Sequence, residues 1–158
     1  MRLTDKGFGI SDKSNTTFHK SDGTGVQIFV SATKVKNMDM MTDSDPQCSL
    51  KSRPMFDEDA PWKFLGDTEV IDNNLNPQWL RHFSINYVFH LDKELKFEVW
   101  NYNTANDKDL IGEVLISLNQ LMGCKGMTMI EPLILPNNKK KGEKRGMLKI
   151  WADTIVKT

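Results

Sequence analysis

The sequence predicts an all-β domain, an antiparallel β-sandwich, from two observations. Short segments in which every second residue is apolar recur along the chain, and this alternation is typical of half-buried strands. Clusters of Asp, Asn, Gly and Pro separate these segments, and no sustained helical period appears between them. Strands joined by turn clusters favour an antiparallel sandwich over a helical or mixed fold.

The alternating segments also name the residues that we expect to face the core. In chain order these are Val26, Ile28 and Val30; Phe83, Ile85, Tyr87 and Phe89; Leu95, Phe97 and Val99; Val114, Ile116 and Leu118; and Leu148 and Ile150. One helical turn is expected at residues 117–123, SLNQLMG. Because one face of each strand is apolar, these segments together can enclose a single core.

Residues 1–23 are expected to be a flexible polar leader, and residues 24–156 the folded domain. The leader is rich in Ser, Thr, Asp, Lys and Gly, so it cannot bury enough apolar surface to order itself. It lacks the apolar run of a secretory signal, and no stretch reaches the roughly 20 apolar residues of a membrane span. Cys48 and Cys124 show no metal-ligand spacing. We therefore expect a cytoplasmic protein with reduced thiols.

Charge and motifs argue against two classes of function. The chain of 158 residues carries 21 basic and 21 acidic side chains, so its formal net charge is zero. A neutral chain gives no global electrostatic reason to bind nucleic acid. The sequence also has no nucleophile signature and no glycine-rich phosphate loop. We expect neither nucleic-acid binding nor enzymatic activity.

Two segments concentrate oxygen ligands at expected loops. The first is NMDMMTDSDP, residues 37–46, and the second is WNYNTANDKDLIG, residues 100–112. Calcium needs six to eight oxygens, which usually come from carboxylates and carbonyls of separate loops. Asp and Asn are also common in ordinary turns, because their side chains cap nearby backbone groups. Both interpretations remain open from composition alone.

Four motifs in order and spacing resemble a C2 domain: NMDMMTDSDP, NPQW at 76–79, LKFEVWNYN at 95–103 and DLIGE at 109–113. More narrowly, LGDTEVIDNNLNPQWLRHFSINYVF at 65–89, together with LKFEVWN, is similar to the first C2 domain of the copines. The resemblance covers residues 24–156. It implies an eight-stranded antiparallel sandwich whose loops at one end bind calcium and then anionic phospholipid. The first strand runs directly into residues 37–46, which we call the acidic loop. This order suggests the circularly permuted (type II) topology.

The resemblance places calcium ligands at five positions. These are Asp39, Asp45, Asn101, Asn103 and Asp109. Positions 101 and 103 are usually Asp in the family, so this chain has three carboxylates where the pattern has five. Because ligand charge is a main determinant of calcium affinity, we expect calcium binding to be weak or lost.

The first oxygen-rich loop also carries Met40 and Met41. Methionine is flexible and apolar, and acidic neighbours disfavour burial of both side chains in the core. Apolar side chains at a loop apex suit insertion into the headgroup boundary of a membrane. Tyr102 on the second loop is expected to join them. The sequence thus predicts a peripheral module that binds anionic phospholipid membranes.

Two other functions and one further surface remain open. A calcium-independent scaffold for a protein partner is kept open by the two Asn substitutions. A carbohydrate-binding sandwich also uses acidic loops, but this sequence lacks a secretory signal and an obvious exposed aromatic platform. The basic run KKKGEKR, residues 139–145, is either a solvated turn or a surface drawn to anionic lipid. The predicted strand order places its loop away from the acidic loops.

Overall fold

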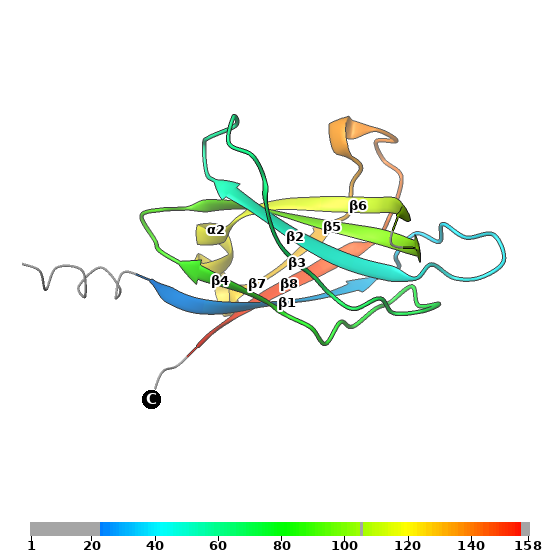
Figure 1. Ribbon diagram of the computed structural model, residues 1–158, viewed down its shortest axis with the longest axis horizontal. Helices are drawn as coiled ribbons and strands as arrows, with labels where there is room; N and C mark the ends of the chain where they lie inside the picture. Colours follow the sequence, from blue (N-terminus) through cyan, green and yellow to red (C-terminus); the bar gives the residue numbers. More distant parts are fainter. Residues whose placement is uncertain (1–22, 105, 156–158) are drawn as a thin grey trace, which may run out of the picture.

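The computed structural model describes residues 23–104 and 106–155, and it confirms the all-β prediction. Eight strands form two antiparallel sheets, ordered β4-β1-β8-β7 and β3-β2-β5-β6. The two sheets lie face to face (Figure 1). The strands are β1 Thr24–Thr33, β2 Pro46–Pro54, β3 Lys63–Asp67, β4 Phe83–Tyr87, β5 Lys93–Thr104, β6 Asp107–Ser117, β7 Thr128–Pro132 and β8 Met147–Thr154. The predicted leader lies outside the described residues, except for Gly23.

The core is built from the inward faces that the alternation predicts. Fully buried side chains with no exposed surface include Val26, Ile28, Val30, Leu95, Phe97, Val99, Leu148 and Ile150. The prediction is wrong for Phe89, which is 72% exposed. Strand β4 ends at Tyr87, whose partner is Thr24 at the start of β1, so the chain turns before Phe89 can face the core.

The connections match the predicted order of elements. Strand β1 leads directly into the acidic loop, and β8 pairs with β1 from Val26 to Thr33. The circular permutation of the topology stays a prediction. The expected helical turn is α2, Leu118–Gly123, which begins where the Ser117 hydroxyl accepts a hydrogen bond from Gln120 N at 3.1 Å. Both cysteines are free thiols, as predicted.

The strand directions separate two groups of loops. The β1–β2 loop, the β3–β4 loop and the β5–β6 turn lie at one end of the sandwich, which we call the tip (Figure 1). The β2–β3 loop, the β4–β5 loop and α2 lie at the opposite end. Within residues 23–104 and 106–155, no helix is long and apolar enough to cross a membrane.

Strand β5 is central to its sheet, and its core side chains should dominate stability. Phe97 has no exposed surface and packs edge-to-face on Phe83, with ring centroids 6.4 Å apart. Phe97→Ala is expected to lower the free energy of unfolding by about 3–5 kcal/mol, because it leaves a cavity in the core. Leu115→Ala, at a position that is 45% exposed, should cost about 0.5 kcal/mol or less. Urea denaturation measures both, and equal losses would contradict this core.

Candidate functional site: the tip loops

A buried amide joins the acidic loop to strand β5. Asn101 has no exposed surface, and its Oδ1 accepts a hydrogen bond from Asp45 N at 2.8 Å. Its Nδ2 donates to Asp39 Oδ1 at 2.9 Å. One side chain therefore satisfies both its polar ends on the same loop, at positions that lie on either side of the loop apex.

A third segment, which the sequence analysis did not assign to the site, completes the tip. Asn73 N donates to Asp45 Oδ1 at 2.7 Å, and Asn74 N donates to Ser44 O at 3.0 Å. On the other side, Tyr102 N donates to Asp45 O at 3.0 Å. The only sequence signal of this role is the turn cluster DNNLNP, because the contributing groups are backbone N–H groups. Asp45 is thus bound from two neighbouring segments at once.

The base of the acidic loop is closed by a buried hydroxyl. Ser44 has no exposed surface, and its Oγ accepts a hydrogen bond from Met38 N at 2.7 Å. The same hydroxyl donates to Lys36 O at 3.1 Å. These bonds cross the loop between its two strands, so only residues between Met38 and Ser44 extend beyond this closure.

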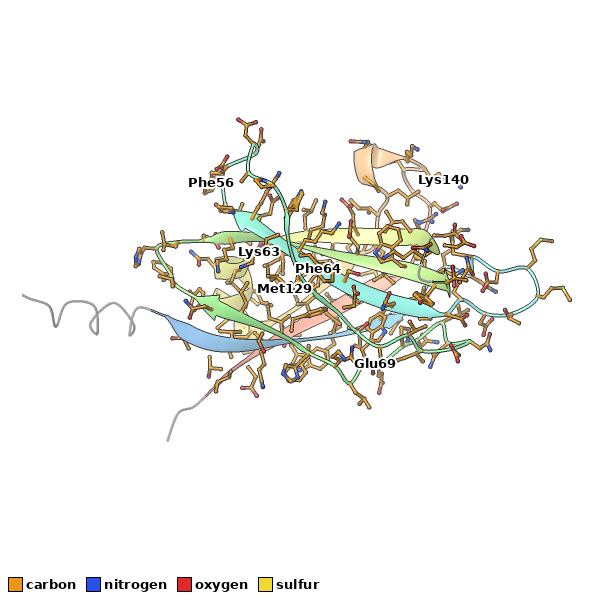
Figure 2. All side chains as sticks on the ribbon, in the orientation of Figure 1. Phe56, Lys63, Phe64, Glu69, Met129 and Lys140 are labelled. Carbon is orange, nitrogen blue, oxygen red and sulfur yellow. The ribbon has the colours of Figure 1, made fainter. Side chains whose placement is uncertain are left out.

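The basic run at 139–145 does not lie away from the tip, which corrects our prediction. Arg145 is buried rather than solvated, and its guanidinium donates to Ile111 O and to Glu143. Its Nη2 also lies 3.8 Å from Met38 Sδ, and its backbone oxygen accepts from Lys36 N at 3.0 Å. The loop therefore packs beside the base of the acidic loop, and its exposed Lys140 faces outward at the tip end of the molecule (Figure 2).

Two methionines form the apex of the acidic loop. Met40 is 99% exposed and Met41 is 94% exposed, so neither folds back into the core, as predicted. The loop projects beyond the ends of the strands (Figure 1). Tyr102 is only half-buried and lies on β5, behind this apex.

The five predicted calcium ligands fall in different environments. Asn101 is buried, Asp39 and Asp45 are half-buried, and Asn103 and Asp109 are exposed. The expectation of a long loop at residues 100–112 is wrong, because β5 and β6 continue as a paired hairpin to Thr104 and Asp107. Asp109 consequently lies on β6 as the strand partner of Asn101 rather than on a flexible loop.

This arrangement does not fit a calcium cage. Among the described residues, no three His, Cys, Asp or Glu side chains come together in a group that could hold a metal ion. The amide nitrogen of Asn101 points a hydrogen at Asp39, where a cation would need to sit, and a donor hydrogen repels a cation. The acidic loop is held to β5 by hydrogen bonds between protein groups.

Comparison with known proteins defines the class. The C2 domain family model matches residues 26–133, and the chain belongs to the C2 domain family. Among curated proteins, it is 29% identical to Copine-A of Dictyostelium discoideum over 133 residues, covering 84% of this chain and 21% of that protein. It is 30% identical to Copine-E of the same organism over 138 residues, covering 85% of this chain and 23% of that protein. It is therefore a copine-like C2 domain that spans about a fifth of the length of these relatives.

Solved structures support the same fold. A single C2 domain of plant Extended Synaptotagmin 1 matches with a TM-score of 0.60 and 20% identity, covering 85% of this chain and 97% of that one. A calcium-bound pair of C2 domains from Extended-Synaptotagmin 2 matches with a TM-score of 0.60 and 18% identity, covering 83% of this chain and 45% of that one. At these identities the likeness shows the fold alone.

The hydrogen bonds of Asn101 should make it a stabilising residue in the absence of calcium. Asn101→Asp removes the donor to Asp39 and sets two carboxylates side by side, so we expect a loss of about 1–3 kcal/mol in the free energy of unfolding. Asn103→Asp makes the same chemical change at an exposed position and should cost about 0.5 kcal/mol or less. Thermal or urea unfolding in chelator tests this, and equal effects of the two substitutions would show that the bridge is not stabilising.

Calcium affinity follows from the same geometry. Without membrane we expect a dissociation constant on the order of 10⁻⁴ M or weaker, because two amides replace carboxylates in the expected ligand set. The double substitution Asn101→Asp and Asn103→Asp adds two ligand charges and removes the opposing donor, so binding should tighten by about tenfold or more. Isothermal calorimetry measures both. A wild-type dissociation constant of ~10⁻⁶ M, within the range of sensor sites, would refute the assigned set of calcium ligands.

Proposed function

We propose that this C2 domain is a peripheral membrane-docking module that inserts Met40 and Met41 into an anionic phospholipid bilayer, with little dependence on calcium. The carrying observation is the nearly complete exposure of these two side chains, 99% and 94%, at the apex of a loop whose base is fixed. Transfer of exposed apolar side chains from water into a bilayer is favourable, so it lowers the free energy of the bound state.

The size of this gain suits reversible attachment. Burying one methionine side chain contributes roughly 1.5–3 kcal/mol, so two together give weak but useful binding. Because the closure at Ser44 and the bridge at Asn101 already order the loop, little conformational entropy remains to be lost on docking. The same bonds keep the methionines outward in the absence of a cation.

Electrostatics support docking from the side of the loop. Exposed Lys139, Lys140 and Lys141 lie on the segment that packs against the base of the acidic loop. Each basic residue near an anionic surface contributes about 1 kcal/mol, and this attraction falls with salt. The lysines therefore offset repulsion between lipid phosphates and the acids at the tip.

Removal of the two apolar side chains tests the proposal. Met40→Ser with Met41→Ser is expected to reduce co-sedimentation with phosphatidylserine-containing liposomes by about tenfold or more, since it removes most of the apolar gain. Chelator should change wild-type binding little. The matched control is Phe89→Ser with Leu91→Ser, which removes two exposed apolar side chains, 72% and 60% exposed, at the opposite end. If the control loses binding and the methionine variant does not, the tip is not the docking surface.

The lysine segment should make a smaller and salt-sensitive contribution. Replacing Lys139, Lys140 and Lys141 with Ser is expected to weaken liposome binding at low salt and to have little effect at about 0.5 M salt, where the Debye length is only a few ångströms. If this change eliminates binding at every salt concentration while the methionine change is silent, a basic face is the membrane surface. If wild type never pellets with liposomes, the protein-scaffold function replaces membrane docking.

A further inference from the structure

A groove of about 890 Å³ opens at the end of the sandwich opposite the tip. It lies where the edge strands of the two sheets, β3 and β4, border the same side of the molecule. These strands approach each other at Gly66, where a Cβ would lie 3.7 Å from the Phe83 ring. Leu65 of β3 and Ile85 of β4 line the groove. Phe56, on its rim, is 92% exposed at the end away from the acidic loop (Figure 2).

The charged side chains of the groove differ in whether they have hydrogen-bond or ion-pair partners. Asp92 accepts hydrogen bonds from the Ser117 hydroxyl at 2.7 Å and from Asn119 N at 2.9 Å. Arg53 forms an ion pair with Glu94 at 3.0 Å. Among the described residues, by contrast, Lys63 and Lys93 have no carboxylate within 4.0 Å. Two cations that share a groove without a counter-ion favour an anionic occupant.

Lys93 itself is in an unfavourable position without such an occupant. Burial lowers its pKa, and the nearby charge of Lys63 lowers it further. Its ammonium donates to the backbone oxygen of Asn86 at 3.2 Å, which only partly replaces its lost hydration. A carboxylate between the two lysines would supply the missing charge.

Within residues 23–104 and 106–155, no strand pairs with the outer edge of β4, and this free edge offers backbone groups beside the lysines. Gly25 O accepts from Ile155 N, so the polar groups of Gly25 point toward β8 rather than toward β4. Its strand partner Asn86 therefore directs its own N–H and C=O to the free edge, as the contact from Lys93 confirms. Ser84, two residues earlier on β4, has the same orientation. Such an edge can accept an additional strand.

We propose that this groove binds an extended acidic segment of a partner protein, which adds as a strand along the free edge of β4. Alternate side chains of the segment are apolar and pack against the groove lining and its exposed aromatic rim. An acidic side chain lies between Lys63 and Lys93. A bilayer is a poorer occupant, because it offers no strand to pair with the edge. The proposal holds whether or not the tip docks to membranes.

The experiment uses the full 158-residue chain and two synthetic peptides. The probe is acetyl-Thr-Val-Glu-Leu-Glu-Val-Thr-amide, and the control peptide has Lys in place of Glu. Titration followed by nuclear magnetic resonance should shift the amide signals of Ser84 and Asn86 and slow their hydrogen exchange, for the acidic peptide only. Equal binding of both peptides, or no shift of these amides at millimolar acidic peptide, would overturn the proposal.

Charge reversal then tests the two lysines. Lys63→Glu with Lys93→Glu should weaken binding of the acidic peptide by about tenfold or more and strengthen binding of the lysine peptide. The reason is that the charge complementarity between groove and peptide is inverted. Lys139→Glu with Lys140→Glu, at the other end, should leave both affinities unchanged, and the dispersed spectra report that each variant is folded. Unaltered binding in the first variant refutes the assignment of the lysines. If deletion of residues 1–22 shifts the groove amides in peptide-free protein, or if the lysines control dimerisation, the occupant is this chain itself and the proposal fails.

Discussion

The buried amide of Asn101 needs a donor for its oxygen and an acceptor for its nitrogen, because an unpaired polar group without solvent is costly. Asp45 N and the Asp39 carboxylate meet these two needs and thereby hold the acidic loop against β5. The loop apex is left with Met40 and Met41, which have no place in the core. A carboxylate at position 101 would have no hydrogen to donate to Asp39, and a cation would then have to bridge the two acids. The amide of Asn101 makes this contact itself and so stabilises the tip.

The two ends of the sandwich are separated by the length of its strands, and β5 contributes residues to both surfaces. Strand β1 has 10 residues and β5 has 12, so each spans roughly 33–40 Å at about 3.3 Å per residue. Strand β5 begins at Lys93 in the groove and contains Asn101 at the tip. A bilayer at the tip and a protein segment in the groove would therefore not compete sterically. The fold permits both to be bound together.

Strands were predictable from the sequence where one face is buried, and poorly predictable elsewhere. The buried faces of β1 and β5 require strict alternation, which the sequence displays. Edge strand β3 has five residues without a fully buried one, so burial imposes no alternating pattern. Residues 101–109 have the composition of a turn, yet the pairing of β5 with β6 makes most of them strand, because tertiary context overrides local preference. The burial of Arg145 could not be predicted, because it belongs to a run of charged residues and such runs are usually exposed to solvent.

The candidate site shows the same division between position and contact. Family resemblance gave the positions of Asp39, Asp45 and Asn101, but their mutual hydrogen bonds require the folded chain. The groove left no sequence signal, since Lys63 and Lys93 come from two different strands of one sheet, β3 and β5, and neither belongs to a motif. Charge satisfaction distinguishes the two surfaces physically. The half-buried acids at the tip have their partners within the protein, which reduces their need for a cation, whereas the groove lysines lack a carboxylate among the described residues and gain most from an external one.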